Sequence, residues 1–89
     1  DVLVDSTEKL YFRDTAIYLN SSTDGQLDLV ADTEIQIAAT TVDLNGNLDV
    51  SGTYTGGGLM TTGGNIVIPD AGNIGSASDT DAIAISSGG

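Results

Sequence analysis

Apolar residues recur at every second position in short runs along most of this chain. The repeated unit is an apolar residue, then any residue, then a second apolar residue. Nine such runs occur, namely Val2–Val4, Leu10–Phe12, Ile17–Leu19, Leu27–Leu29, Ile35–Ile37, Val42–Leu44, Leu48–Val50, Ile66–Ile68 and Ile83–Ile85. Alternation with a period of two is typical of a β-strand that buries one face. Apolar residues at helical spacing are not sustained, so we expect an all-β chain with no helix.

Turn-forming residues separate the runs and set their spacing. The six runs between residues 10 and 50 begin at positions 10, 17, 27, 35, 42 and 48, so successive starts lie 6 to 10 residues apart. This is a degenerate repeat, and residues 24–52 are its most regular part. Asp24-Gly25 and Asn45-Gly46 are typical turn dipeptides, and we expect Asn45-Gly46 to reverse the chain between two short strands.

The runs are too short to give one chain a substantial core. Each run buries two residues, which is a thin core for 89 residues, and the chain has no Cys for disulfides. Three-residue strands also present unpaired edges that invite pairing with another chain. We therefore predict a homotrimeric, intertwined triple-stranded β-helix or β-prism fibre with its apolar pairs on the axis. The alternative is a single-chain β-solenoid, which would be monomeric.

The middle residue of each run is predicted to face outward. In the central part these residues are polar, which predicts a solvated surface: Asp28, Gln36, Asp43 and Asp49. Towards the ends they are apolar or aromatic, which predicts cover by another layer or a partner: Leu3, Tyr11, Tyr18, Val67 and Ala84.

The strongly negative charge of the chain argues against nucleic acids and anionic membranes as partners. The net charge is −11, from 13 acidic residues against Lys9 and Arg13, and no cation follows Arg13. Contacts with nucleic-acid phosphates need Lys and Arg, and so does docking on an anionic membrane. No apolar stretch approaches the roughly 18 residues of a membrane-spanning helix. We expect neither nucleic-acid binding nor membrane insertion.

Two stretches resemble the shafts of phage tail fibres and tail spikes. They are residues 27–37 (LDLVADTEIQI) and residues 41–52 (TVDLNGNLDVSG). Residues 72–83 (GNIGSASDTDAI) are similar to segments of phage structural proteins that often precede a receptor-binding end. The resemblance implies a trimeric β-helix in the virion, extracellular and on the phage tail. Iron-tipped spikes of this class carry His-x-His ligands, and this chain has no His.

Three regions follow from the pattern and the resemblance. Residues 1–52 are predicted to form a repetitive β-helical shaft, residues 53–64 a Gly-rich transition, and residues 65–89 a second β module that continues the fibre. The expected function is structural: a rigid rod that supports a host-receptor-binding tip, in contact with other copies and other tail components. An alternative places a small host-recognition knob, binding a glycan or a protein, at residues 53–89.

The carboxylates raise an enzymatic alternative. A glycosidase uses two carboxyl groups about 5 to 9.5 Å apart, one of them with a raised pKa. Asp28, Asp43 and Asp49 could line a groove between subunits of a polysaccharide depolymerase. No pair is marked out, so we favour a solvated face and predict that the chain is not an enzyme and has no catalytic residues.

Other motifs are interpreted structurally. Residues 43–54 depart from the EF-hand calcium pattern in the position of Gly46 and in ending on Tyr54, although a weak surface or axial ion in an acidic trimer stays open. The glycines of residues 56–64 have no P-loop Lys and are expected to permit positive φ or close approach of chains. We predict no metal-binding or cofactor-binding residues and no cofactor.

Two features near the start of the chain have alternative interpretations. Tyr11, Tyr18 and Arg13 could form an outward recognition patch, but we favour packing at the end of the shaft. Asn20-Ser21-Ser22 fits a glycosylation sequon, and we interpret it as a turn.

Overall fold

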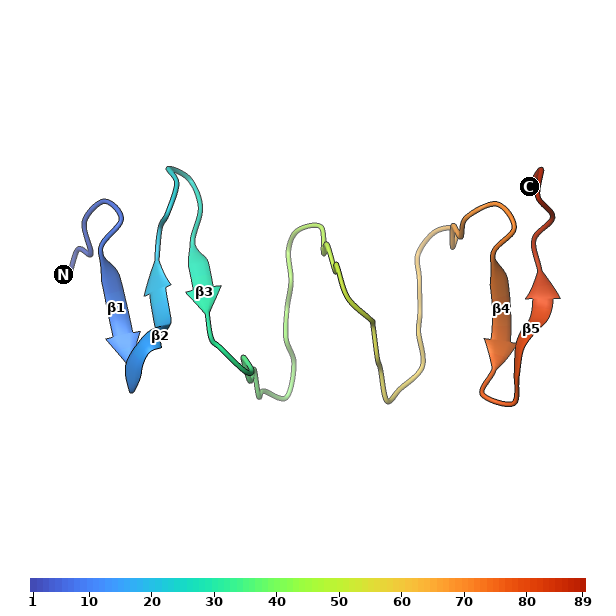
Figure 1. The fold of residues 1–89 in the computed structure, drawn as a ribbon, viewed down its shortest axis with the longest axis horizontal. Coiled ribbons are helices and arrows are strands. Elements are labelled where there is room, and N and C mark those ends of the chain that lie inside the picture. Colours follow the sequence, from blue (N-terminus) through green and yellow to red (C-terminus); the bar gives the residue numbers. More distant parts are fainter. The chain divides into compact units, whose positions relative to one another are not determined.

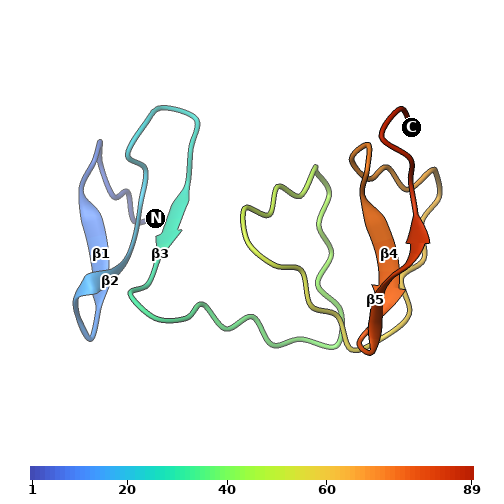
Figure 2. The same ribbon diagram turned by 45° about the vertical axis from the view of Figure 1, so that its right-hand side comes forward.

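A computed structural model describes all 89 residues and contains five β-strands and no helix (Figure 1). The all-β prediction is therefore confirmed. Strands β1 (Lys9–Phe12), β2 (Asp14–Asn20) and β3 (Asp28–Val30) form one antiparallel sheet in the order β1-β2-β3, while β4 (Asn73–Ser76) and β5 (Asp79–Ala84) form a second. Figures 1 and 2 both show the strands of each sheet side by side. The chain divides into two units, residues 1–48 and 49–89, with one sheet in each. No helix is long and apolar enough to cross a membrane.

The register of the first sheet separates its two faces. Leu10 on β1 pairs with Leu19 on β2, which pairs with Leu29 on β3. Directly paired residues share a face and successive residues alternate, so these leucines lie together. Tyr11 and Tyr18 pair one position along and lie on the opposite face. The alternation in the sequence predicted these same sides.

Two turns bring the strands of the first sheet together. The Gln26 N–H donates to the Thr23 carbonyl at 3.1 Å, and Gly25 has a φ of 85°, which glycine adopts without steric cost. The turn predicted at Asp24-Gly25 is thus confirmed. Between β1 and β2 the chain reverses through Arg13 at a φ of 68°, and the Asp14 carboxylate accepts the Ala16 N–H at 2.8 Å. The pairing register shifts at this end of the hairpin.

The second sheet is a hairpin that continues past its strands. Ile74 pairs with Ile83, the Ile85 N–H donates to the Gly72 carbonyl at 2.8 Å, and the Ala71 N–H donates to the Ser86 carbonyl at 3.0 Å. The register shifts between Ile74 and Ser76, where the backbone of β5 approaches Gly75. A Cβ on Gly75 would overlap the Asp79 carbonyl oxygen and the Thr80 backbone. Only glycine fits at this position without a backbone shift.

The segment between the two sheets has no partner within the chain. Residues 32–68 contain no strand and take part in no backbone–backbone hydrogen bond. Four of the predicted strands lie in this segment: residues 35–37, 42–44, 48–50 and 66–68. The chain bends at Gly46, but the two short strands predicted on either side of Asn45-Gly46 do not form, and no backbone hydrogen bond closes the turn. A strand needs a paired neighbour for its backbone groups, and the chain offers none here.

The chain also lacks a hydrophobic core. No hydrophobic residue is buried, and Leu10, Leu29 and Ile35 are each about half exposed. A folded monomer of 9.0 kDa exposes about 4,900 Å² of surface, whereas this chain exposes 8320 Å². Both sheets are antiparallel and local, so neither contains the stacked parallel coils of a β-solenoid.

Replacing Gly75 tests the close approach in the second sheet. We expect Gly75→Ala to separate β4 from β5, because the added methyl group overlaps backbone atoms that cannot rotate away. The amide hydrogens of Ala71 and Ile85, which are bonded across this hairpin, should then exchange faster with solvent. Gly64→Ala is the matched control, since nothing lies within 4 Å of a Cβ at Gly64. Unchanged exchange in Gly75→Ala would contradict this packing.

Candidate functional site

One face of the first sheet gathers apolar side chains with nothing over them. We call Leu10, Phe12, Ile17, Leu19 and Leu29 the apolar face. A hollow of about 200 Å³ lies against Phe12, Ile17, Leu19 and Leu29, and Ile35 extends its lining beyond the sheet. Covering the exposed half of each of these side chains would stabilise a complex by roughly 1 kcal/mol per residue. The apolar face is the strongest candidate for an association surface in this unit.

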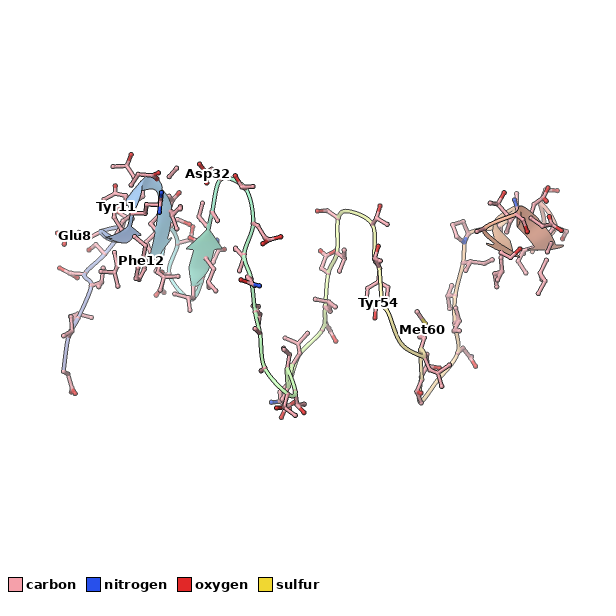
Figure 3. All side chains as sticks on the ribbon, turned by 90° about the horizontal axis from the view of Figure 1, so that it is seen from below. Glu8, Tyr11, Phe12, Asp32, Tyr54 and Met60 are labelled. Atoms are coloured by element: carbon pink, nitrogen blue, oxygen red, sulfur yellow. The ribbon has the colours of Figure 1, made fainter.

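The opposite face carries an aromatic pair and a cation. The Tyr11 and Tyr18 rings are 6.0 Å apart at 74°, in an edge-to-face arrangement. The Lys9 ammonium lies 4.5 Å from the centre of the Tyr18 ring, a cation–π contact worth about 0.5–1 kcal/mol where exposed. Figure 3 shows Tyr11 and Phe12 on opposite sides of β1. We call Lys9, Tyr11 and Tyr18 the tyrosine face.

Lys9, and not Arg13, is the cation that contacts this pair. Arg13 lies in the turn that joins β1 to β2. The candidate patch predicted from the sequence therefore names the wrong cation. The signal was present in the sequence, since Lys9 and Tyr11 are two residues apart and share one face of a strand.

Asp28 is half-buried at the start of β3 and is held in a local hydrogen-bond network. Its carboxylate accepts the Ser22 N–H at 2.9 Å and the Gln26 side-chain amide at 2.6 Å. Hydrogen bonds from the Ser22 side chain, the Gln26 side chain and the Ser22 backbone favour the charged form and lower the pKa of Asp28 below its ordinary value of 3.8. A glycosidase general acid needs the opposite shift. The network instead fastens the β2–β3 loop to the start of β3.

The other candidate carboxylates take no part in this network. Asp43 and Asp49 are exposed in the unpaired segment and belong to different units. No group of three or more acidic side chains is arranged to hold a metal ion within the chain.

The Gly-rich region does not use the backbone freedom that we expected. Positive φ occurs among glycines only at Gly25 and Gly89, so that part of the prediction for residues 56–64 is wrong. Tyr54 lies beside Gly56, where an added Cβ would be 3.4 Å from the ring. Around the remaining glycines of residues 56–64 a Cβ would meet nothing. Close approach of other chains remains the prediction there.

Asn20 is the one buried polar residue, and the sequence pattern did not reveal it. It ends β2, and the sequon continues into the β2–β3 loop. The side chain is 8% exposed, its Nδ2 donates to the Thr7 carbonyl at 3.4 Å, and its Oδ1 has no hydrogen-bond partner. We interpreted Asn20 as part of a turn, whereas it ends β2 and the loop follows it. The turn at Asp5–Glu8, closed by a 3.0 Å hydrogen bond, precedes β1 and brings Thr7 against it.

Comparison with known proteins adds no relative. No protein-family model matches the chain, and neither the search of curated proteins nor the search of solved structures gives a significant match.

The pKa of Asp28 can be measured directly. A carboxyl titration by NMR should give a midpoint below 3.8. Because the folded pKa is lowered, the contribution of Asp28 to stability is present above the unfolded pKa and is lost as the pH falls through the folded one. Ser22→Ala removes the hydroxyl but keeps the backbone donor, and should move the midpoint back towards 3.8. A wild-type midpoint at or above 3.8 would refute the network.

Proposed function

We propose that three copies of this chain intertwine into a triple-stranded β-helix or β-prism that serves as a rigid shaft segment of a phage tail fibre or tail spike. The observation that carries the proposal is the state of residues 32–68. Their backbone makes no backbone–backbone hydrogen bond in the chain, and nearly all of their large apolar side chains are exposed. Association of copies would supply hydrogen-bond partners for the backbone and would cover the apolar side chains.

Backbone chemistry favours pairing between copies over other ways of burying these residues. A buried N–H or C=O without a partner costs about 1–3 kcal/mol. Covering Ile35 or Leu44, which are 50% and 57% exposed, therefore stabilises the fold only if the neighbouring backbone is paired as well. A second extended chain supplies hydrogen-bond partners and apolar side chains at matching intervals.

The charges are compatible with such an assembly. Each copy carries a net charge of −11, so three copies repel one another unless the acids stay in water. Asp28, Asp43 and Gln36 occupy outward positions in the predicted prism, whereas the paired inward positions are aliphatic. The remaining negative surface would keep assembled rods from aggregating side by side.

The biological assignment rests on the resemblance of residues 27–37 and 41–52 to tail-fibre and tail-spike shafts. A shaft needs self-association, stiffness and a solvated exterior, and it needs no pocket for a substrate. We propose that its partners are two further copies and adjoining tail components, with a host receptor contacted at the tip. The location would be the virion, outside the host cell.

Mass in solution and one charge substitution test this proposal. Sedimentation equilibrium of the wild-type chain should give three times 9.0 kDa. Ile35→Asp should abolish association, because it would place three like charges near the axis. Gln36→Asp adds the same charge at a predicted outward position and should leave the mass unchanged.

Two outcomes would contradict the shaft. A wild-type mass of 9.0 kDa would show that the chain does not associate. A full-size assembly of Ile35→Asp would show that Ile35 does not face the axis.

A second candidate function is host recognition by residues 53–89. The hydrogen bonds that extend the β4–β5 hairpin close within this part of the chain, and Val67 beside it is 89% exposed. A locally closed hairpin with an exposed Val67 nearby in the sequence suits a binding knob. An array of bacterial surface glycans probed with the whole chain should then give binding that Val67→Asp removes. Absence of binding to every glycan on the array would count against a glycan-binding knob.

A further inference from the structure

The turn dipeptide Asn45-Gly46 lies in the unpaired segment between the two sheets. Both residues are exposed, the chain bends at Gly46, and the Gly46 N–H donates to no backbone carbonyl. Nothing lies within 4 Å of a Cβ built on Gly46, so the space around this residue is open. Glycine has no side chain to shield its own amide nitrogen. The Asn45 side chain and the Gly46 nitrogen are therefore free to approach each other.

We propose that Asn45 is a site of spontaneous deamidation through attack by the Gly46 amide nitrogen. The two reacting groups belong to neighbouring residues, so the step is intramolecular and needs no encounter with a second molecule. The Gly46 nitrogen loses its proton and bonds to the Asn45 Cγ. The bond from Cγ to Nδ2 breaks, and the side-chain nitrogen leaves with that proton as ammonia. A succinimide ring remains.

Water then opens the ring at either of its two carbonyl carbons. Attack at the Asn45 Cγ restores the normal backbone and leaves aspartate at position 45. Attack at the main-chain carbonyl carbon leaves isoaspartate, in which the backbone runs through the Asn45 side chain. Water is the only reactant that the chain does not itself supply, and no oxidant or reductant takes part.

The other four asparagines each lack one of these conditions. Asn20 is buried, and Asn73 is paired within β4. Asn47 and Asn65 are exposed, but the residue after each is Leu or Ile, whose side chain hinders the attacking nitrogen. Asn45 is thus the one asparagine that combines exposure, an unpaired backbone and a following glycine.

Both products change the chain between two of the runs that the proposed shaft would pair. Each adds a negative charge close in sequence to the exposed Asp43. Isoaspartate also lengthens the backbone by one atom between residues 42–44 and 48–50. Strand pairing depends on regular spacing of the two faces, so we expect isoaspartate to hinder association more than the added charge does. This consequence rests on the proposed shaft, whereas the deamidation does not.

Mass spectrometry of the ageing chain tests the site. The whole chain is incubated at mildly alkaline pH, which favours loss of the amide proton, and fragments are compared over time. Deamidation exchanges NH for oxygen in the mass, and electron-based fragmentation distinguishes isoaspartate from aspartate. We expect both products at position 45, with Asn47 in the same segment reacting about tenfold or more slowly.

Gly46→Ala is the matched variant, because its methyl group hinders the nitrogen and meets nothing else within 4 Å. It should slow the reaction at Asn45 by about tenfold or more. Equal rates at Asn45 and Asn47, or an unchanged rate at Asn45 in Gly46→Ala, would overturn the proposed site.

Chains aged before assembly test the consequence for the shaft. Isoaspartate at position 45 should be enriched among unassembled chains and depleted from the three-chain assembly. Asn45→Asp carries the added charge on a normal backbone and should assemble as wild type does. Equal isoaspartate content in both fractions would overturn the effect on association. A fresh wild-type chain that stays monomeric would overturn the shaft and this effect together, while the rates at Asn45 would still decide the site.

Discussion

An extended backbone that makes no backbone–backbone hydrogen bond within its own chain is the constraint on which the structure depends. Peptide N–H and C=O groups must be paired when they leave water, and the alternating side chains of residues 32–68 gain free energy only by leaving water. Neither requirement is met within one copy. The two sheets at residues 9–30 and 73–84 pair the chain locally and leave the segment between them open.

Pairing within each sheet and pairing between copies would use different surfaces. Pairing within the chain places the leucines of the apolar face side by side, but they remain about half exposed. The sheet therefore forms an apolar surface that nothing in the chain covers. On the tyrosine face, the Lys9 ammonium already contacts the Tyr18 ring within the chain. The Asp28 network holds the β2–β3 loop to the start of β3. In the proposed shaft, these local elements position one chain for the next.

Much of the first sheet was predictable because period-two alternation determines which side chains share a face. Leu10, Leu19 and Tyr18 lie on the predicted sides, and the glycine of Asp24-Gly25 adopts the positive φ that the turn needs. The features that escaped prediction depend on contacts between distant residues. Asn20 is buried through Thr7, and Gly75 is required by the backbone of β5. The chain bends at Gly46 as its turn preference predicted, but the flanking strands do not form because they have no paired neighbour in the chain.

Hydrogen exchange of the backbone amides in residues 32–68 is the most direct test of the central claim. In a sample whose mass is that of three chains, these amides should be protected about as strongly as those of β2, because neighbouring copies would supply their acceptors. Exchange at the rate of an unstructured chain, in a sample of that same mass, would contradict the account, because the copies would then associate without pairing the backbone that their association is proposed to satisfy.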